Sequence, residues 1–476
     1  MSEYRHGAYA DQEDSLDFTS PSGVGTVPVY IGRAPVHQLG DYAGKTNVPI
    51  LITSWQDGRR KIGYSDLWKD FDLCEAVYAH FCNSVNGVGP VVVINVLNPD
   101  DKKNEKKQSE TVKFIKRTAL IHSALVILST ITIEGKELDT DFSAEYADDG
   151  LSVILKDLKG GLDSVSVSFY ETDPSGVTDA ELIAGINAGV PRVYYDLSVV
   201  PTILCAPGWS QKPAVLAALI AMQNKINGHW YAWINADMDA AAVKTVDAAI
   251  AAKEAYENVT GAAALLWPMA RKGGHIFHAS TLETVTMQWV DYQNNNVPYE
   301  TPSNKQIDID SLCLANGSAI RFDQTEANRL NANGIDTMTF WEGVWRMWGP
   351  HTMKYTEGTN VNARDVFDCN VRMMRFVENT FQRRYGVEVD KPMTRGRKDS
   401  ILNDFQAWLD SLIQDGALLL GAVSFQESNN PIGDLVEGNF VFSTEFTNPV
   451  PGKSISNIVR WTSAGLNSLF GGGSNA

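Results

Sequence analysis

The chain has 476 residues, which is too long for one ordinary hydrophobic core, so we expect two or three domains. Apolar residues make up 44% of the chain and charged residues 20%, the composition of a globular protein. The net charge of -17 argues against nucleic acid as the primary partner, because duplex binders present a clustered basic face.

Targeting and membrane signals are missing from the sequence. No window reaches about 18 uninterrupted apolar residues, the length that spans a bilayer. The first 30 residues lack a basic region followed by an apolar run, so we expect no signal peptide and folding in a cytoplasm. The five cysteines are odd in number and include no Cys-x-x-Cys pair, which predicts free thiols.

The N-terminal part predicts an arm followed by the start of an α/β domain. Residues 1–23 are polar, contain few core residues and end in a Pro- and Gly-containing segment, so they are expected to lie outside the globular body. "VGTVPVYIGRAP" then predicts the first core strand. Apolar residues recur at three and four from Ser65 to Val85, which predicts an amphipathic helix, and "GPVVVINVLNP" predicts a buried strand after it.

The rhythm changes at the charged run of residues 98–110. The strand-like segments that follow are separated by turn residues at intervals of about eight to twelve positions, which is typical of antiparallel sheets. After Pro174 helical and strand patterns alternate again. We therefore predict a discontinuous α/β core, residues 24–97 and 176–350, interrupted by an all-β insertion over residues 98–175.

Residues 351–450 predict a C-terminal α+β domain. Two amphipathic helical patterns begin near Phe367 and Ile401, and "EGNFVFSTEF" alternates like a half-buried strand. After "TNPVPG", residues 451–476 predict a C-terminal arm and a flexible tail. Ile455, Val459 and Trp461 would share one face of a strand in this arm.

The search for chemistry finds no established motif. The Gly-rich segments lack dinucleotide-binding order, and P-loop, His-Glu-x-x-His and Gly-x-Ser-x-Gly patterns do not occur. His275 and His278 lack the partners of a zinc site, and Asp237 and Asp239 are interpreted as helix-capping residues. The sequence therefore predicts no catalytic, cofactor-binding or metal residue and no enzyme, although a triad assembled from distant segments stays open.

A local basic excess is the one unusual charge pattern. Between Arg364 and Lys398 there are nine basic and five acidic residues, within a strongly acidic chain. The pattern fits either a solvated helix face or a docking face for an acidic protein surface. The predicted basic patch consists of Arg372, Arg375, Arg383, Arg384, Arg395, Arg397 and Lys398.

Three tryptophans, Trp341, Trp345 and Trp348, lie within eight residues of one another. Asn333 and Gly334 predict the end of a helix. Residues 335–341 and 344–348 predict two strands joined by a tight turn. The rings fit a stacking platform for a ligand or a packed joint; we predict a joint between the core and the C-terminal domain, with Trp345 and Trp348 in its packing and no ligand.

Several segments, in the same order along nearly the whole chain, resemble the tail sheath proteins of contractile-tailed bacteriophages, phage-tail-like bacteriocins and related contractile injection systems. They are "EYRHGAYADQE", "VPVYIGRAP", "VVPTILCAPGW", "YETPSNKQI" and "EANRLNANGIDTMTFWEGVWRMWGPHT". The most specific part comprises Asn331, Gly334, Ile335, Thr337, Gly343, Trp345, Trp348, Gly349 and Thr352. The resemblance fits phage sheaths and bacteriocin sheaths alike.

The resemblance implies a discontinuous α/β core of subtilisin-like topology without a protease site. The all-β insertion would face outward, the C-terminal α+β domain would face the tail tube, and both arms would link neighbouring subunits by β-strand addition. The matching arm positions are Tyr4, Arg5, His6, Gly7, Ala8 and Tyr9 at the N-terminus, and Ile455, Ile458, Val459, Arg460, Trp461 and Leu466 at the C-terminus.

The implied function is mechanical. Subunits would polymerise helically around the tail tube in stacked rings, with six-fold symmetry, and contract to drive the tube through the target cell envelope. The implied partners are other copies of the chain, the tube, baseplate and terminator proteins, with no cofactor, nucleic acid or membrane. The protein would lie in a virion tail or a free contractile particle assembled in the host bacterial cytoplasm. The basic patch would dock on an acidic tube surface. A carbohydrate-binding tail protein and an α/β hydrolase with an unrecognised triad remain the alternatives.

Overall fold

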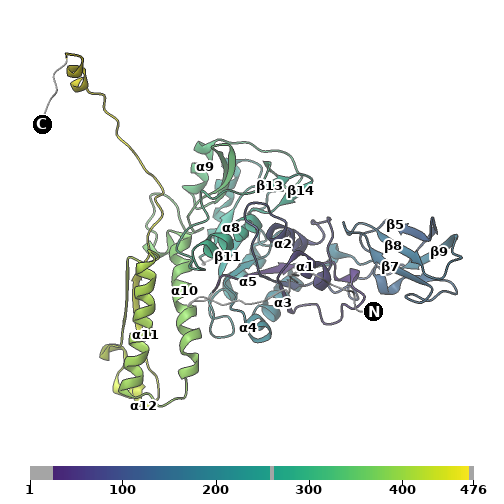
Figure 1. Cartoon of the computed structure of the whole chain (residues 1–476), viewed down its shortest axis with the longest axis horizontal. Helices are drawn as coiled ribbons and strands as arrows, with labels where there is room; N and C mark the ends of the chain where they lie inside the picture. The colour runs from purple at the N-terminus through teal and green to yellow at the C-terminus, as the bar shows by residue number, and fades with distance from the viewer. Residues whose placement is uncertain (1–24, 258–261, 471–476) are drawn as a thin grey trace, which may run out of the picture.

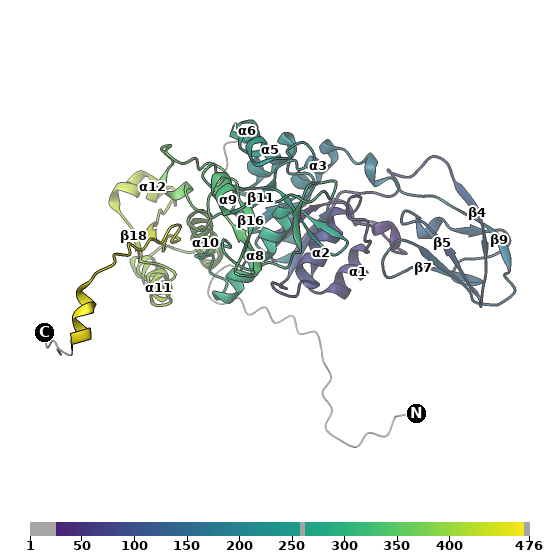
Figure 2. The same ribbon diagram turned by 90° about the horizontal axis from the view of Figure 1, so that it is seen from above.

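The structure, a computed structural model, describes residues 25–257 and 262–470. An α/β body lies in the middle of the molecule, antiparallel sheets lie at one end, and long helices lie at the other (Figures 1 and 2). The predicted N-terminal arm residues Tyr4, Arg5, His6, Gly7, Ala8 and Tyr9 fall outside the described residues.

A six-stranded sheet forms the centre of the body, in the order β12-β11-β10-β1-β3-β2. The strands are parallel except β2, which runs antiparallel to β3. The residues of β1, β3 and β10 are all buried, because near-continuous apolar runs such as "VVVIN" need cover on both faces. The strands are β1 (Pro28–Gly32), β2 (Pro49–Ile52), β3 (Val91–Asn95), β10 (Ile203–Cys205), β11 (Trp233–Asp237) and β12 (Ala264–Leu266).

Helices cover both faces of this sheet. The paired helices α2 (Asp72–Phe81) and α8 (Ala279–Gln293) pack on one face, and α3 (Asp179–Gly189) and α5 (Pro213–Met222) pack on the other. A Cβ on Gly189 of α3 would lie 2.7 Å from Ile94 of β3, so this glycine permits the close approach of helix to sheet. The remaining core helices are α1 (Trp55–Ile62), α4 (Arg192–Leu197), α6 (Val246–Ala252), α7 (Glu254–Glu257) and α9 (Gln324–Asn331).

The helix predicted over residues 65–85 is shorter in the structure, where α2 covers only Asp72–Phe81. Tertiary hydrogen bonds explain the difference. The main-chain N of Asp66 donates to the main-chain O of Asp149 (2.9 Å), and Ser65 Oγ donates to the main-chain O of Gly150 (3.2 Å). These bonds to the insertion hold residues 65–70 in a non-helical path despite their helical spacing.

The segment between β3 and α3 folds into two three-stranded antiparallel sheets, β4-β9-β6 and β5-β8-β7. Phe142, Val153, Leu155 and Val167 are fully buried between them, in a core separate from that of the α/β body. This observation agrees with the predicted all-β insertion, whose limits at 98 and 175 stay a prediction. The strands are β4 (Gln108–Lys113), β5 (Thr118–Ile121), β6 (Thr132–Ile133), β7 (Phe142–Tyr146), β8 (Val153–Asp157) and β9 (Ser164–Phe169).

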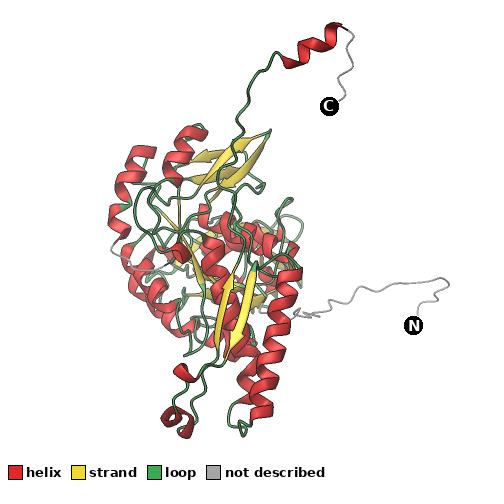
Figure 3. Cartoon of the chain, turned by 90° about the vertical axis from the view of Figure 1, so that its left-hand side faces the viewer, coloured by secondary structure: helices red, strands yellow, loops and turns green. Residues whose placement is uncertain are grey.

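The C-terminal part pairs two long helices, α10 (Asp368–Tyr385) and α11 (Arg395–Gln414), with a two-stranded sheet. Figure 3 shows this sheet, β18 (Leu420–Ser424) and β19 (Ser443–Thr447), beside the helices. Their own core includes Met373, Phe405 and Leu409. The strand predicted in "EGNFVFSTEF" begins only at Ser443. Just before it, the main-chain N and O of Val441 are both hydrogen-bonded to the side chain of Asn430, so they do not pair with a strand.

Smaller elements complete the chain. They are β13 (Met269–Lys272), β14 (His275–Phe277), β15 (Ser311–Cys313), β16 (Thr337–Trp341), β17 (Val344–Trp348) and α12 (Ile432–Val436). No helix among the described residues has the length and apolar character needed to cross a membrane.

Candidate functional site: the joint and the arm root

The predicted helix end at Asn333 and Gly334 is confirmed. Gly334 has a left-handed φ of 62°, its main-chain N donates to the main-chain O of Asn331 (3.0 Å), and that of Ile335 donates to Leu330 (3.1 Å). This pair of bonds is the Schellman motif, which closes the free carbonyls of a helix end. The side chains of Leu330 and Ile335 are both fully buried, in line with the hydrophobic contact that frequently accompanies the motif.

The predicted hairpin is also confirmed, with β16 pairing with β17 from Thr337–Trp348 to Trp341–Val344. Glu342 and Gly343 both have positive φ, 51° and 83°, which is the two-residue type I′ turn that matches strand twist. The main-chain N of Asp336 donates to Leu265 (2.8 Å), so the hairpin begins beside the edge strand β12 of the central sheet.

The family-motif residues meet at the base of this hairpin. Asn331 Nδ2 donates to the main-chain O of Ile335 (3.0 Å) and of Trp348 (2.9 Å), which ties the two ends of the hairpin together. Gly349 has φ of 140°, and a Cβ there would lie 2.1 Å from Asp336 Oδ1. The motif therefore encodes backbone geometry and close packing at this point.

Of the three tryptophans of the hairpin, Trp345 packs against the core, and two are tied to the body by hydrogen bonds from their indole nitrogens. Trp345 Nε1 donates to the main-chain O of Asp310 (3.2 Å), and Trp348 Nε1 donates to Asn328 Oδ1 (3.0 Å). Trp341 stays 47% exposed. The joint to the C-terminal helices, in which Trp345 and Trp348 were predicted to pack, is made by other residues.

That joint is made by one face of α10. Arg375 donates through Nη1 to the main-chain O of Ala232 and through Nη2 to Gln223 Oε1 (2.7 Å), beside β11. Burial lowers the pKa of Arg375 to about 10. Asn379 exchanges two hydrogen bonds with the main chain of Tyr231, at 2.9 and 2.8 Å. These contacts fix α10 on the end of the α/β body.

A buried ion pair lies next on the same face. Arg372 of α10 pairs with Asp291 of α8, and the two side chains are 4% and 0% exposed. Thr26 Oγ1 donates to the same carboxylate oxygen of Asp291 (2.6 Å). The pair connects α10, α8 and the segment that leads into β1.

The predicted basic patch is therefore wrong for two of its seven members. Arg372 and Arg375 are buried at the joint, where they satisfy a carboxylate and a main-chain carbonyl, so neither reaches a partner surface. The other five, Arg383, Arg384, Arg395, Arg397 and Lys398, are exposed or half-buried. Acidic neighbours offset several of these charges: Arg384 lies 3.6 Å from Asp404, Arg397 lies 3.3 Å from Glu388, and Lys398 lies 2.6 Å from Asp399.

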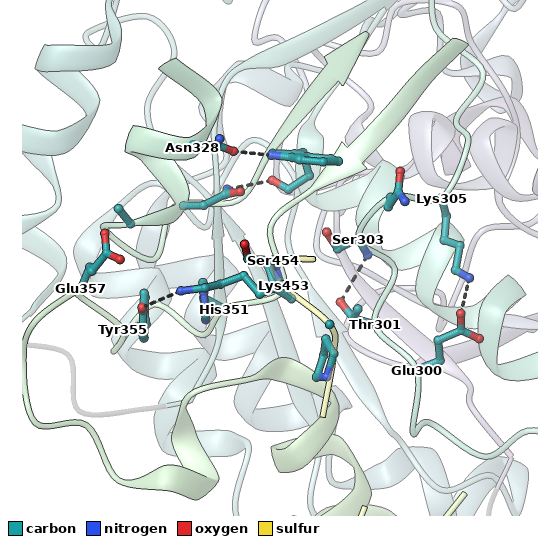
Figure 4. Close-up of a pocket in the computed structure, with 17 residues that line it drawn as sticks. Glu300, Thr301, Ser303, Lys305, Asn328, His351, Tyr355, Glu357, Lys453 and Ser454 are labelled. Atoms are coloured by element: carbon teal, nitrogen blue, oxygen red, sulfur yellow. Dashed lines mark hydrogen bonds and ion pairs between the residues drawn. The ribbon is translucent and has the colours of Figure 1, made fainter. Parts of the chain in front are cut away.

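The root of the C-terminal arm crosses a polar cleft of about 560 Å³ (Figure 4). Lys453 of the arm donates to the hydroxyl of Tyr355 (3.2 Å), and the Tyr355 ring stacks on His351 at 3.7 Å. Trp348 and Glu300 line other walls of the cleft. Burial lowers the pKa of His351 to about 4, so the stacked ring is neutral at physiological pH.

Beyond this root the arm leaves the body (Figure 1). Ile455 is 93% exposed, Ile458 81%, Val459 82% and Trp461 83%, and no strand is assigned over residues 451–463. Arg460 and Leu466 are exposed as well. A row of apolar side chains held away from every other part of the described chain is costly in water, which points to a surface that covers them in an assembly.

Comparison with known proteins identifies the architecture. No family model matches the sequence. The tail sheath protein of Burkholderia phage BcepMu is 23% identical over 480 residues, covering 94% of this chain and 93% of the phage protein. Along nearly its whole length, the chain is similar in sequence to a tail sheath protein. The contracted sheath of the anti-feeding prophage shares the fold with a TM-score of 0.57 at 13% identity, covering 96% of this chain and 98% of that chain.

A second sheath, from the contracted PVC extracellular injection system, has a TM-score of 0.55 at 14% identity and covers 98% of this chain and 99% of that chain. The sheath fold therefore extends over the insertion, the joint and the C-terminal helices.

Sequence reasoning missed the residues that anchor α10 to the α/β body. Arg372, Arg375 and Asn379 follow one another at spacings of three and four, which places them on one helical face, and that spacing was the available signal. The positive charges of Arg372 and Arg375 alone suggested an exposed surface. No local pattern in the sequence predicted the arm-root cleft, because its walls come from several separate segments between Glu300 and Ser454.

Proposed function

We propose that this protein is the structural subunit of a contractile tail sheath. The chain would polymerise helically with other copies of itself, associate with a baseplate, and shorten to drive a tube through a target envelope. The single observation that carries this proposal is the match in sequence and fold along nearly the whole chain to sheath proteins. The protein acts mechanically in this proposal, and none of its residues is assigned to catalysis.

For the layout we propose a core of residues 24–97 and 176–350, of subtilisin-like topology without a protease site. The insertion of residues 98–175 faces outward, and residues 351–450 face the tube. The insertion and the α10–α11 pair lie at opposite ends of the molecule, which supports this arrangement (Figure 2). We further propose six-fold rings around a tube protein, closed by a terminator protein, in a virion tail or a free particle assembled in the host cytoplasm.

The arms link subunits in this proposal. The sheet of β18 and β19 has only two strands within the described chain, and such a sheet is marginal alone. An arm strand from a neighbour would extend it through main-chain hydrogen bonds. Burying the four apolar side chains Ile455, Ile458, Val459 and Trp461 would contribute on the order of 10 kcal/mol before ordering costs. Residues 4–9 are proposed to contribute a second link.

Substitutions in the arm test this link. The variant carrying Val459→Asp and Trp461→Asp should remain folded, because both side chains are exposed in the monomer, and should no longer polymerise. Tyr195→Asp is the matched control, since Tyr195 on α4 is 82% exposed but lies on the body. Size-exclusion chromatography with light scattering and negative-stain microscopy give the readout. Long polymers from the arm variant would contradict the proposed link.

The exposed basic residues near the distal end of α10 are proposed to contact the tube. Arg383 is exposed, and the side chain of Arg395 is 91% exposed. Because acidic neighbours offset much of the surrounding charge, the attraction should be weak and sensitive to salt. Weak contact suits a surface that has to release during contraction.

A further inference from the structure

Four carboxylates and one guanidinium are buried together where the α/β body meets α10. Glu283 and Asp291 lie on α8, Asp336 precedes β16, and Asp368 and Arg372 lie on α10. Their exposures are 1%, 0%, 2%, 1% and 4% in that order. Three segments that are distant in sequence thus bring acidic groups into one dry region at the joint.

Two of the four carboxylates accept hydrogen bonds from side chains through one oxygen, although Asp291 Oδ1 is buried without a partner among the described residues. Asp291 is paired with Arg372 and accepts from Thr26. Asp368 accepts from Thr301 Oγ1 (3.0 Å) and from the main-chain N of Cys369 (2.6 Å). The single guanidinium is therefore already engaged with the carboxylate of Asp291.

No side chain of the described chain donates a hydrogen bond to the other two carboxylates. Glu283 Oε1 and Asp336 Oδ1 are buried and have no hydrogen-bond partner among the described residues. Ionising a carboxyl group without a partner in a dry interior costs several kcal/mol, so such a group keeps its proton instead. Burial raises the pKa of Glu283 well above its usual value, and the nearby Asp368 raises it further, while the Arg372 guanidinium lowers it.

Asp336 follows the same pattern. Burial raises its pKa well above the usual value, and the carboxylates of Glu283 and Asp368 raise it further, while a hydrogen bond from the main chain of His351 lowers it. Burial also raises the pKa of Asp368, to about 6. Each ionisation in this region therefore makes the next one harder.

The remaining charged groups around the cluster do not neutralise it. Glu300, on the loop after α8, raises the pKa of Asp291 and is itself paired with Lys305. The Cys369 thiol on α10 is buried beside Asp368, and burial raises its pKa. No group of three or more His, Cys, Asp and Glu side chains in the described part of the chain is arranged to hold a metal ion.

We propose that Glu283 and Asp336 are protonated in the folded chain at neutral pH, and that their ionisation in alkali loosens α10 from the α/β body. The geometry that carries this inference is the placement of two buried carboxyl groups, each with one oxygen that lacks a hydrogen-bond partner, against the helix that anchors the C-terminal part. The contact between α10 and the α/β body then weakens as pH rises, within a single subunit. It does not depend on the proposed function.

The sign of the pH dependence follows from the direction of the shifts. At acid pH these carboxyl groups are protonated in both the folded and the unfolded chain, so they do not lower the free energy of unfolding. Above about pH 4 they ionise in the unfolded chain but not in the folded chain, so the free energy of unfolding falls as pH rises. Glu283→Gln and Asp336→Asn mimic the protonated forms and do not titrate. The thermal midpoint of each variant minus that of the wild type should be near zero at pH 4.5 and should grow to several degrees by pH 9.

Glu342→Gln is the control, because Glu342 lies on the same hairpin with a side chain that is 72% exposed. Its difference from the wild type should stay flat over the same pH range. Hydrogen exchange of α10 should accelerate between pH 7 and pH 9 beyond the intrinsic rate in the wild type, and this extra acceleration should be absent in the variant with both substitutions.

Infrared spectroscopy of the wild-type protein in D2O gives a readout that does not require a stable variant. A protonated-carboxyl stretching band should persist at pH 7 and disappear in alkali together with the loss of protection of α10. A spectrum without that band at pH 7, or variant differences that do not change with pH, would overturn the proposal. A thermal midpoint that rises selectively with added K⁺, Na⁺ or Mg²⁺ would also overturn it, because a cation would then neutralise the site.

Discussion

Asn379 of α10 and Tyr231, two residues before β11, exchange a pair of hydrogen bonds. The main-chain N of Tyr231 donates to Asn379 Oδ1 (2.9 Å), and Asn379 Nδ2 donates to the main-chain O of Tyr231 (2.8 Å). The amide side chain thus bonds to both main-chain groups of Tyr231, as a neighbouring strand would, and fixes the direction in which α10 leaves the body.

Asn379→Ala should therefore lower the free energy of unfolding by about 1–3 kcal/mol, because both main-chain groups of Tyr231 lose their partner. Chemical denaturation measures the effect. Gln382→Ala serves as the control, since its bond to the main-chain O of His229 (2.9 Å) is exposed, and it should cost less than about 0.5 kcal/mol. Equal costs for the two variants would contradict the role given to Asn379.

The buried pair of Arg372 and Asp291 predicts strong non-additivity. Arg372→Met leaves the Asp291 carboxylate buried without its cation and should cost about 3–5 kcal/mol. The double variant with Asp291→Leu should recover much of that loss, because an apolar pair of similar volume removes both charges. A double-mutant cycle measured by denaturation tests the prediction, and additive losses would show that the two side chains do not act as a pair.

Gly349 is a position in the family motif where neither the backbone conformation nor the surrounding space suits a side chain. A Cβ would lie 2.1 Å from Asp336 Oδ1 and 2.7 Å from Asn331 Nδ2, at φ of 140°. Gly349→Ala should abolish soluble expression or lower stability by more than about 3 kcal/mol. Gly358→Ala, at φ of 81° in open space, should cost only about 1 kcal/mol. Comparable stabilities would mean that the motif glycine is not needed for packing.

Charge reversal tests the proposed tube contact. Arg383→Glu with Arg395→Glu should slow polymerisation templated by the cognate tube protein and leave the thermal midpoint within about 2 °C of the wild type, because both residues are exposed. The difference should shrink as salt rises from about 0.05 to about 0.5 M. Co-sedimentation with tubes measures the binding. Unchanged binding at every salt concentration would remove these residues from the interface.

The sequence predicted those elements that depend only on residues close to one another in the chain. The buried runs of β1 and β3, the turn at Glu342 and Gly343, and the glycine that ends α9 all followed from hydrophobic periodicity or from a backbone geometry that favours glycine. The C-terminal helices followed from their apolar spacing in the same way.

The residues of the joint were misplaced because burial of a charge depends on distant partners. Arg372 is buried only because α8 brings Asp291 to it, and Arg375 only because the chain before β11 presents a free carbonyl. Glu283 lies in the run "ASTLETVTM", where one acid among small and apolar residues is a signal for burial, but its unpartnered state appears only in three dimensions. Contacts between subunits lie beyond any single chain.

Negative-stain electron microscopy of the purified full-length protein tests the central claim most directly. As a sheath subunit with an unsatisfied apolar arm, the protein should form hollow tubes or stacked rings as its concentration rises, and the Val459→Asp, Trp461→Asp variant at the same concentration should give isolated particles. Featureless monomers from the wild-type chain at every concentration, with or without tube protein, would contradict the account.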